Sequence, residues 1–557
     1  MLNKLSLYWQ TIKKLTFSQL LWRFVYTVKR KCIERCGQRV FDRIEKDVSD
    51  YVNERCAKPF PQAPGLDRTY YKADLDKLLD NEFTFLNQTV KFGEEVEWHR
   101  PEFAKGTRLW KLTINYHEYL IDVANKWKNE GVDSKWGKWF ECHVKEWMRH
   151  NPLGTKGYGF DNWNSYALSL RIVSWIRVCA IVGDFMSHDF KRDFVNWLAV
   201  QSRFLGENIE YDILGNHIVK NWKALMWAGT FFGDKLLLEE GRKTFVRYVS
   251  PQFTKSGMHE ELSPMYAAIV LGDIHDVMAF DGIRDNMLLE VEKKLSSCLG
   301  YLSFGNDWAR FNDSCFGMAL PPDNFKKSFG SFAFDGYVGG RYENWQWMAD
   351  CGAPVVGRQP GHAHCDALSF EFGRMGDKIF TNAGVYEYNP GERRVYSRSS
   401  VAHNTLSVEG HEQHEMWKAF RCGRLGNAQG LKWSHGEEED SWSGAFVSFD
   451  ESYRHRRKMT LSENKITCDD DFSSVKGLSG TLNFHLTPGY YAKATDNGID
   501  VCRQGSDVSI ATMKSDGESI SVVKMPYFPE YGREVMSDVV RIAIYDGQHV
   551  NTEVVFR

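Results

Sequence analysis

The sequence has no long apolar run, since none of its hydrophobic stretches reaches the roughly 18 residues that a helix needs to cross a bilayer. An excess of charge of one sign is also missing, because 70 Lys and Arg residues face 73 Asp and Glu residues, for a net charge of -3. The first absence argues against an integral membrane protein. The second leaves no overall electrostatic case for a nucleic-acid partner.

Paired cysteines are missing as well. The 12 cysteines are scattered singly, without a CxxC pair or the dense spacing of a disulfide framework. We therefore expect reduced, mostly buried thiols and a reducing compartment. The first residues are basic but lack a clean apolar core and a small-residue cleavage site, so no signal peptide is recognised. These features predict a cytoplasmic or membrane-surface location, with the periplasm as the alternative.

The first 24 residues nevertheless carry an apolar stripe with helical spacing, formed by Leu5, Trp9, Ile12, Leu15, Leu20 and Phe24. Such stripes usually face a protein core, so we expect a helix packed on the domain. A surface anchor is the alternative.

Aromatic residues are plentiful: they make up 14% of the chain, including 19 Trp. Flat rings suit either a large core or a cleft that binds the apolar faces of sugars, and we expect core packing for most of them.

Helical periodicity dominates up to about residue 300. Apolar residues recur at steps of three and four over 163–182, 190–205, 216–232 and 286–304. Many helices of similar length predict stacked helical hairpins, arranged either as a solenoid or as a closed α/α toroid. No strict repeat of the kind that a regular solenoid shows is present.

The period changes to two after about residue 340. Leu368, Phe370 and Phe372 alternate before a hairpin turn at 373–377. Further strand-like runs are 406–408, 482–486, 518–524, 538–545 and 552–556. Strands that follow helices predict a multidomain α+β chain, with a helical domain over 1–320 and an antiparallel β-sandwich over 321–557. The stretch 305–360 is expected to connect them, beside a cleft between the domains.

Two motifs lie at predicted helix starts. In Gly215-Asn216-His217, Asn216 suits an N-cap, or an amide donor beside an imidazole at the positive end of a helix. In Ser263-Pro264-Met265-Tyr266, Ser263 caps a helix and Pro264 is its first residue. Tyr266 then lies in the first turn, either packed in the core or at a site.

Two further motifs precede predicted strands. His362 and His364 form an HxH pair, and a strand would place both imidazoles on one face. This arrangement suits either a metal site or one metal ligand beside one catalytic group. The stretch 396–405 offers Tyr396, Arg398 and His403. Arg398 suits a substrate carboxylate, or a surface salt bridge.

Together, Asn216-His217, SPMY, PGHAHCDALSFEF, NAGVYEYNPG and RSSVAHNTLSVEG resemble the heparinase II/III-like polysaccharide lyases. The resemblance implies an incomplete α/α toroid followed by an antiparallel β-sandwich. It also implies β-elimination at a uronic acid of an acidic polysaccharide. In that reaction a base removes the C5 proton, an acid protonates the leaving oxygen, and the uronate carboxylate is neutralised.

The resemblance also implies residue roles. Asn216 would neutralise the carboxylate with help from His217 or His362, and Tyr266 would act as acid, and as base too in a syn elimination. His362 matches the sandwich-domain catalytic histidine. The candidate substrate-binding residues are Glu261, Arg358, Tyr396 and Arg398.

Members of the family often hold a structural divalent metal, usually zinc. The positions that match its ligands are His364, Asn382 and His403. The family pattern has an aspartate where this chain has Asn382, and a neutral amide is a weaker zinc ligand than a carboxylate. The alternatives are a weakened zinc site and a hydrogen-bonded link between the two histidines.

Two other functions remain open from the sequence. A glycoside hydrolase would need two carboxylates, for which the candidates are Glu260, Glu261, Asp307 and Asp313. A glycan-binding or assembly factor of polysaccharide biosynthesis would share the fold but turn over little. The sequence fixes neither the uronate polymer nor the oligomeric state.

Overall fold

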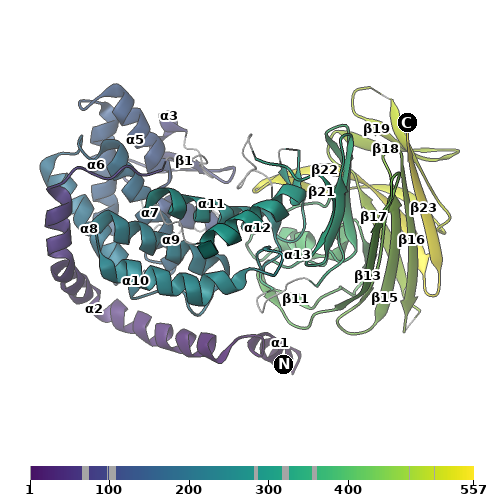
Figure 1. Ribbon diagram of the computed structural model, residues 1–557, viewed down its shortest axis with the longest axis horizontal. Coiled ribbons are helices and arrows are strands. Elements are labelled where there is room, and N and C mark those ends of the chain that lie inside the picture. Colours follow the sequence, from purple (N-terminus) through teal and green to yellow (C-terminus); the bar gives the residue numbers. More distant parts are fainter. Residues whose placement is uncertain are drawn as a thin grey trace. The chain divides into compact units, whose positions relative to one another are not determined.

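Contacts along the chain divide the molecule into two units. The computed structural model describes all residues except 1, 65–73, 97, 99–107, 282–285, 306, 316–324, 354–359, 476 and 507. The helical unit comprises Thr16–Gln252 and Val270–Glu292, and the sandwich unit comprises Met1–Leu15, Phe253–Ile269 and Lys293–Arg557 (Figure 1). This division differs from the predicted border at residues 320 and 321. Two helices, α11 (Pro264–Asp281) and α12 (Asn286–Leu302), have residues in both units, and Met1–Leu15 belongs to the sandwich unit.

The helical unit contains most of the helices. Its elements are α2 (Phe17–Cys56), α3 (Leu75–Leu78), β1 (Glu82–Phe85), β2 (Gln88–Lys91), α4 (Arg108–Tyr116), α5 (Tyr119–Glu130), α6 (Lys135–His150), α7 (Ser165–Val182), α8 (His188–Gly206), α9 (Gly215–Phe232), α10 (Lys235–Thr244), a π-helical turn (Phe245–Val249) and a 3₁₀ turn (Ser250–Gln252). The predicted helices at 163–182, 190–205 and 216–232 are confirmed as α7, α8 and α9. The α/α toroid is confirmed with them.

Tryptophans fill the core of the helical unit, as expected from their number. Trp110, Trp127, Trp136, Trp147, Trp163, Trp175 and Trp227 are all fully buried. Trp175 of α7 stacks on Phe194 of α8 with ring centroids 4.2 Å apart. Buried aromatic pairs of this kind add to the free energy of packing and hold neighbouring helices in register.

Among the described residues, α7 alone is long and apolar enough to cross a membrane. Most of this helix is buried inside the protein, with 72% of its residues covered. A core helix of a folded domain has the same composition, so α7 is weak evidence for a membrane span.

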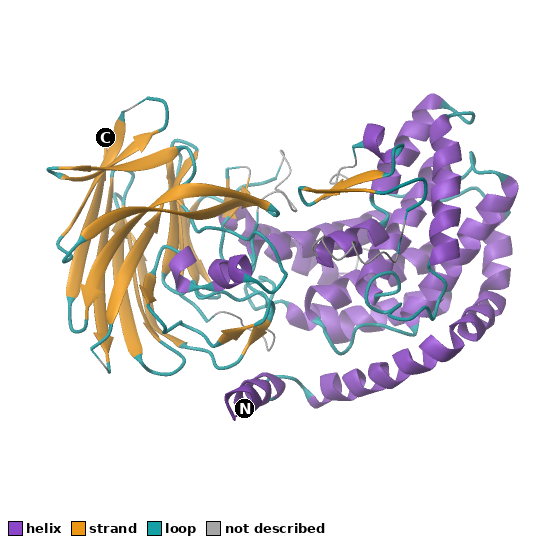
Figure 2. Ribbon diagram, turned by 180° about the vertical axis from the view of Figure 1, so that it is seen from behind, coloured by secondary structure: helices purple, strands orange, loops and turns teal. Residues whose placement is uncertain are grey.

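The sandwich unit consists mainly of antiparallel strands (Figure 2). Its helical elements are α1 (Leu2–Ile12), α12 (Asn286–Leu302, which begins in the helical unit), α13 (Glu392–Arg398) and a 3₁₀ turn (Ser400–Ala402). Its first strands are β3 (Ser303–Phe304), β4 (Asp307–Trp308), β5 (Gly330–Phe334), β6 (Tyr337–Arg341), β7 (Trp345–Asp350), β8 (Ser369–Arg374), β9 (Asp377–Phe380), β10 (Leu406–Val408), β11 (Met416–Trp417) and β12 (Arg421–Cys422). The remaining strands are β13 (Asn427–His435), β14 (Asp440–Val447), β15 (Tyr453–Leu461), β16 (Lys465–Ser474), β17 (Ser479–His485), β18 (Tyr490–Thr495), β19 (Gly498–Arg503), β20 (Ser509–Ser515), β21 (Ile520–Glu530), β22 (Arg533–Tyr545) and β23 (His549–Phe556).

Three sheets enclose the core of this unit. Their strand orders are β5-β6-β7-β8-β9, β10-β17-β22-β21 and β13-β14-β15-β16-β23-β20-β19-β18. One continuous cluster of buried side chains joins them, including Phe370, Ile542 and Met459, one from each sheet. The antiparallel β-sandwich is thus confirmed. The stretch 305–360, which was expected to connect the domains, instead contributes β5, β6 and β7 to the sandwich unit.

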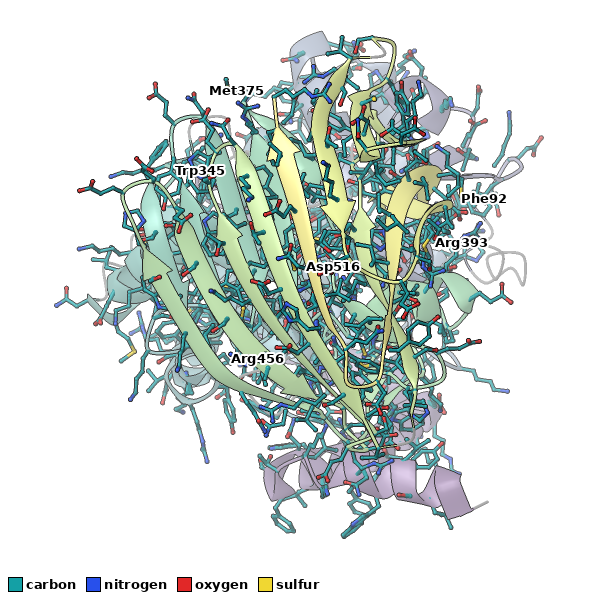
Figure 3. The ribbon with its side chains drawn as sticks, turned by 90° about the vertical axis from the view of Figure 1, so that its right-hand side faces the viewer. Phe92, Trp345, Met375, Arg393, Arg456 and Asp516 are labelled. Carbon is teal, nitrogen blue, oxygen red and sulfur yellow. The ribbon has the colours of Figure 1, made fainter. Side chains whose placement is uncertain are left out.

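Alternation along the strands explains why the predicted runs fold this way. In β15, buried and exposed residues alternate from Tyr453 to Leu461, with His455 and Met459 turned inward. Arg456, labelled in Figure 3, is one of the exposed residues between them. A period of two buries one face of a strand and leaves the other to solvent.

The apolar stripe near the N-terminus does not pack as expected. It is split between α1 and α2, because Thr16 and Gln19 form a capping box that starts a new helix at Phe17. Leu5, Trp9, Leu20 and Phe24 are exposed. The prediction that this face packs on the domain is therefore wrong.

Candidate active site

The start of α11 positions Tyr266. Leu262, just before the helix, has φ of 50°, and the Ser263 hydroxyl accepts a hydrogen bond from the Tyr266 N–H at 3.4 Å. Pro264 is the first helical residue. Tyr266 lies in the first turn, as predicted, and is 7% exposed.

The two histidines of the HxH pair converge on one carboxylate. They lie in a turn and loop, because β8 begins only at Ser369, so the prediction that they start a strand is wrong. Nδ1 of His362 lies 2.9 Å from Oδ2 of Asp313, and Nε2 of His364 lies 2.7 Å from Oδ1. A strand was expected to place the two imidazoles on one face. Instead, the carboxylate of Asp313 brings the two rings together by binding both.

Arg394 of α13 binds the same carboxylate with two N–H groups, one of them 2.8 Å from Oδ2 of Asp313. Burial alone would raise the pKa of Asp313, but Arg394 and the two histidines hold that pKa well below its ordinary value. The carboxylate is ionised and can only accept hydrogen bonds. The hydrogen bond to Asp313 requires a proton on Nδ1 of His362, so in the neutral imidazole the lone pair is on Nε2.

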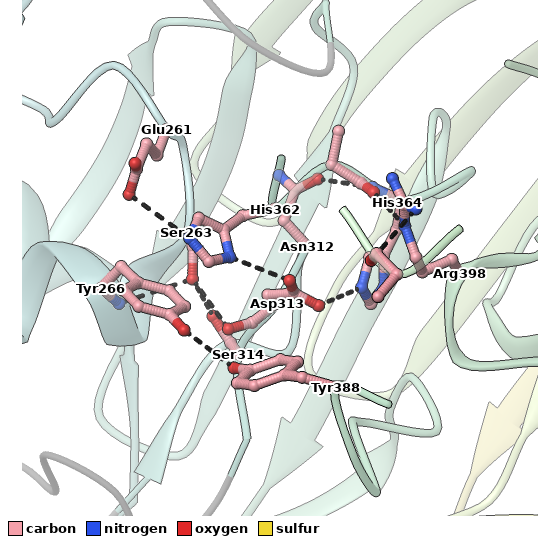
Figure 4. A network of polar contacts seen from close by, with 12 residues as sticks. Glu261, Ser263, Tyr266, Asn312, Asp313, Ser314, His362, His364, Tyr388 and Arg398 are labelled. Atoms are coloured by element: carbon pink, nitrogen blue, oxygen red, sulfur yellow. Dashed lines mark hydrogen bonds and ion pairs between the residues drawn. The ribbon is translucent and has the colours of Figure 1, made fainter. Parts of the chain in front are cut away.

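Tyr266 lies against this oriented imidazole. The rings of Tyr266 and His362 have centroids 3.8 Å apart and are tilted by 32°. The Tyr266 hydroxyl donates a hydrogen bond to the Tyr388 hydroxyl at 3.1 Å (Figure 4). Burial raises the pKa of Tyr388 well above its ordinary value, so this second phenol stays protonated. The guanidinium of Arg394 lies 5.1 Å from the centre of the Tyr388 ring.

The segment Asn312–Ser314 ties these parts together. The Asn312 side chain donates to the carbonyl of Leu262 at 2.9 Å and accepts from the N–H of His364 at 3.0 Å. The Ser314 hydroxyl accepts from the N–H of Met265 at 3.2 Å. Three consecutive residues thus hold the helix start that carries Tyr266 and the loop that carries His362.

Glu261 lies near Nε2 of His362, whereas Asp313 binds Nδ1. Oε2 of Glu261 is 3.9 Å from Nε2 of His362 and 3.8 Å from Nδ1 of His259. Burial, together with the charge of Glu261, raises the pKa of Glu260 to about 7. Glu261 is buried next to a candidate catalytic group, so the structure places this predicted substrate-binding residue within the cluster.

Two predicted substrate-binding residues bind backbone carbonyls of loops in this structure. Arg398 is 2% exposed, and its guanidinium donates to backbone carbonyls, among them those of Ala363 and Ala419. The Tyr396 hydroxyl donates to the carbonyl of Pro526. Both side chains hold loops in place. Arg358 lies outside the described residues.

Asn216 and His217 belong to the helical unit. Helix α9 begins at Gly215 after Leu214, whose φ is 64° and whose side chain provides no cap, so of the two alternatives for Asn216 the N-cap is wrong. A leucine in this backbone conformation is strained, and strain of this kind gathers at functional sites. Nδ1 of His217 lies 3.1 Å from Oε1 of Glu210.

The residues that match the family's zinc ligands do not fit a zinc site. The Asn382 side chain donates to the carbonyl of Arg310, and its oxygen accepts from the N–H of Asn404. His364 and His403 face each other with ring centroids 5.3 Å apart. Nδ1 of His364 and both nitrogens of His403 have no hydrogen-bond partner among the described residues, so each ring can offer one nitrogen as a ligand. The nearby carboxylate of Asp313 already accepts from three side chains. Four ligands, as a structural zinc needs, are not assembled here among the described residues.

The sequence did not reveal the roles of Asp313, Tyr388 and Arg394. Tyr388 lies inside the NAGVYEYNPG motif, and this motif is the sequence feature that could have pointed to it. From the sequence, Asp313 is a candidate only as a hydrolase carboxylate. That role does not suit a carboxylate that is ionised and already accepts hydrogen bonds from three side chains. Asp307, another such candidate, is paired with Arg310 and Lys378.

Two family models match the chain. The one described as Heparinase II/III N-terminus covers residues 41–288, and the one described as Heparinase II/III-like, C-terminal covers residues 326–553. Together they span most of both units. No curated protein sequence matches significantly.

Solved structures share the fold. Heparinase III matches with a TM-score of 0.72 at 17% identity, over 92% of this chain and 85% of that chain. Heparan sulfate lyase HepC from Pedobacter heparinus matches with a TM-score of 0.57 at 16% identity, over 92% and 88%. Chondroitin AC lyase from Streptomyces coelicolor A3 matches with a TM-score of 0.52 at 9% identity, over 92% and 79%.

Proposed function

Because the chain belongs to the heparinase II/III-like family, and is thus a polysaccharide lyase, we propose that it cleaves a uronic-acid-containing polysaccharide by β-elimination at Tyr266 and His362. The observation that carries this proposal is the ionised Asp313, which fixes the tautomer of His362 while the imidazole lies against Tyr266.

The reaction needs one proton removed and one proton delivered. A base takes the proton from C5 of the uronate, and the electron pair of that bond forms a double bond between C4 and C5. The bond from C4 to the glycosidic oxygen breaks, and this oxygen leaves with its electron pair and takes up a proton. No water is consumed, and the new sugar end is unsaturated.

Tyr266 is the proposed acid, and in a syn elimination also the base. A phenol with an ordinary pKa of about 10 is a poor base at neutral pH, so it needs help. His362 can supply it, because a proton on Nε2 would create a positive charge beside the Tyr266 ring that stabilises a phenolate. Tyr388 keeps its proton and can donate it as a hydrogen bond to that phenolate.

Asn216 and His217 are the proposed groups for the uronate carboxylate, on the basis of the family resemblance. A neutral amide donates hydrogen bonds to a carboxylate without fixing a proton, and negative charge grows on that carboxylate as C5 loses its proton. Glu210 orients His217 much as Asp313 orients His362.

A panel of uronate polymers tests the proposal. Elimination creates a double bond conjugated to a carboxylate, so ultraviolet absorbance should rise with at least one heparin-like, alginate-like, hyaluronate-like or bacterial exopolysaccharide chain. A neutral glucan is the control and should give no rise. Chain cleavage with flat absorbance would indicate hydrolysis, and tight binding without product would indicate an assembly factor. Either result overturns the proposed reaction.

A further inference from the structure

Helix α2 has two apolar faces, and the protein covers one of them. Gln19, Tyr26 and Ile33 are buried on the inner face. A second set of apolar side chains recurs at steps of three and four and therefore shares the opposite face: Phe17, Leu20, Leu21, Phe24, Val25 and Val28. All six are exposed, with Phe17 at 82% and Phe24 at 68%. We call these six residues the outer face of α2.

Exposed apolar side chains are concentrated in this part of the chain. Of the 26 large apolar side chains that are exposed among the described residues, ten lie between Leu5 and Val28. Helix α1 contributes Leu5, Trp9 and Ile12, which are spaced to share one face of that helix. Single exposed apolar residues are normal on a soluble protein, but a contiguous set marks an interaction surface.

The charge of the same segment indicates the partner. The first 33 residues contain seven basic residues and no Asp or Glu; the first acid is Glu34. Lys31 and Arg35 follow Val28 at steps of three and seven, so they continue the outer face, and both are exposed. A helix with apolar side chains on one face, flanked by Lys and Arg, is suited to the interface of an anionic bilayer.

We propose that the outer face of α2 binds the surface of an anionic phospholipid membrane. The helix lies along the interface, its Phe, Leu and Val side chains enter the boundary between headgroups and acyl chains, and Lys31 and Arg35 meet lipid phosphates. This proposal is independent of the proposed lyase function.

A second copy of the chain suits this surface less well. Pairing two outer faces would bring together two segments that each carry only basic charges, and like charges repel across an interface. An anionic bilayer instead supplies the opposite charge. Acyl chains can also cover apolar side chains that project from a curved helix surface, without a groove to receive them.

The test uses the full chain and vesicles. We expect it to co-sediment at least about tenfold better with phosphatidylcholine vesicles that contain roughly one third phosphatidylglycerol than with phosphatidylcholine alone. Raising the salt to about 0.5 M should weaken this binding, because surface charges are then screened. Equal sedimentation with both vesicles, or with neither, would overturn the proposal.

Matched variants locate the surface. Phe17→Ser combined with Leu21→Ser and Phe24→Ser should lower vesicle binding about tenfold or more. The control, Val246→Ser with Val475→Ser and Val508→Ser, changes three exposed valines elsewhere and should bind as the unchanged chain does. All six positions are exposed, so folding should survive.

Two further results complete the test. Lys31→Gln with Arg35→Gln should reduce binding to the anionic vesicles only. If the unchanged chain forms a dimer that the triple serine variant disrupts, and neither binds vesicles, the outer face is an interface between copies and the proposal fails.

Discussion

The two units hold their candidate groups in different ways. In the helical unit, Glu210, His217 and Asn221 lie within twelve residues of each other, and local hydrogen bonds join them. In the sandwich unit, Tyr266, Asp313, His362 and Arg394 are separated by up to 128 residues of sequence, and they meet around one buried carboxylate.

This difference determines what each unit loses when one residue changes. The local arrangement around His217 needs only that α9 and the preceding loop fold. The sandwich arrangement depends on Asp313, because one carboxylate accepts from Arg394, His362 and His364 at once. A single change there disturbs several segments, whereas a comparable change in the helical unit stays local.

The largest effect is expected for Asp313→Asn. The substitution leaves the buried Arg394 without its counter-charge, and breaking such a pair costs about 3–5 kcal/mol of the free energy of unfolding. Turnover should fall too, since His362 loses the group that fixes its tautomer. Urea unfolding and the ultraviolet assay measure the two effects.

Glu210→Gln in the helical unit is the matched control. Its amide oxygen can still accept from Asn221, while its NH2 group replaces the oxygen that faces His217, so one hydrogen bond is weakened and the loss should be about 1–2 kcal/mol. Equal losses of stability in the two variants would show that the sandwich arrangement is no more interdependent than the local one.

Substitutions of the two histidines that bind Asp313 should affect different properties, one mainly turnover and the other mainly stability. His362 is accessible, with its side chain 13% exposed, whereas the side chain of His364 is 1% exposed. His362→Ala should lower turnover by about 10²–10⁴ with little loss of stability. His364→Ala should mainly lower the melting temperature, because it removes a buried ring. The reverse pattern, read by turnover per folded molecule, would contradict the assigned roles.

Acid should destabilise both units through buried histidines. Burial lowers the pKa of His143 in the helical unit and of His414 in the sandwich unit to about 3. The folded state keeps both rings neutral, while the unfolded chain takes up protons below pH ~6.5. The free energy of unfolding therefore falls as the pH drops from about 6.5 to about 3.

At pH 5 each of these two histidines should account for about 2 kcal/mol of the loss. His143→Gln and His414→Gln should each reduce by one the number of protons that the chain takes up on unfolding in acid, so the free energy of unfolding should depend less steeply on pH. Urea unfolding at several pH values measures this, and a free energy of unfolding that stays constant between pH 7 and 5 would contradict the expected burial.

Asn382→Asp should lower stability modestly without metal and should create a zinc site. The new carboxylate would face the carbonyl of Arg310, to which Asn382 now donates, so stability should fall by about 1–3 kcal/mol. Added zinc should restore it, because His364, His403 and the new carboxylate then supply three ligands, and water can supply the fourth.

Asn483→Asp is the control for the zinc site, since Asn483 is also buried and donates to a backbone carbonyl. Zinc should not raise its melting temperature. If elemental analysis finds stoichiometric zinc in the unchanged chain, the fit argued for the His364–His403 region is wrong.

Much of the fold could be predicted from periodicity. The predicted alternation correctly placed Phe370 and Phe372 in β8, although Leu368 lies just before the strand. Steps of three and four predicted α7 and α9. Periodicity reports which face of an element is buried. It does not report a break such as the capping box at Thr16, or that a helix face stays exposed, as in α2.

The site could be predicted only where motifs were local. Tyr266 follows from a capping residue and a proline within four positions. The role of Asp313 could not be predicted in this way, because nothing near it in the sequence shows that His362, 49 residues later, will donate a hydrogen bond to it. Arg398 was misjudged for a related reason, since an arginine that binds loop carbonyls looks the same in sequence as one that binds a substrate.

The most direct test of the account is the turnover of Tyr266→Phe on the uronate polymer that gives the fastest rise in absorbance. Tyr453→Phe is the control, because Tyr453 is a buried tyrosine of the sandwich core whose hydroxyl has no hydrogen-bond partner among the described residues. The account predicts that Tyr266→Phe folds normally and turns over about 10²–10⁴ times more slowly, while Tyr453→Phe matches the unchanged chain. Near-normal elimination by Tyr266→Phe would contradict it.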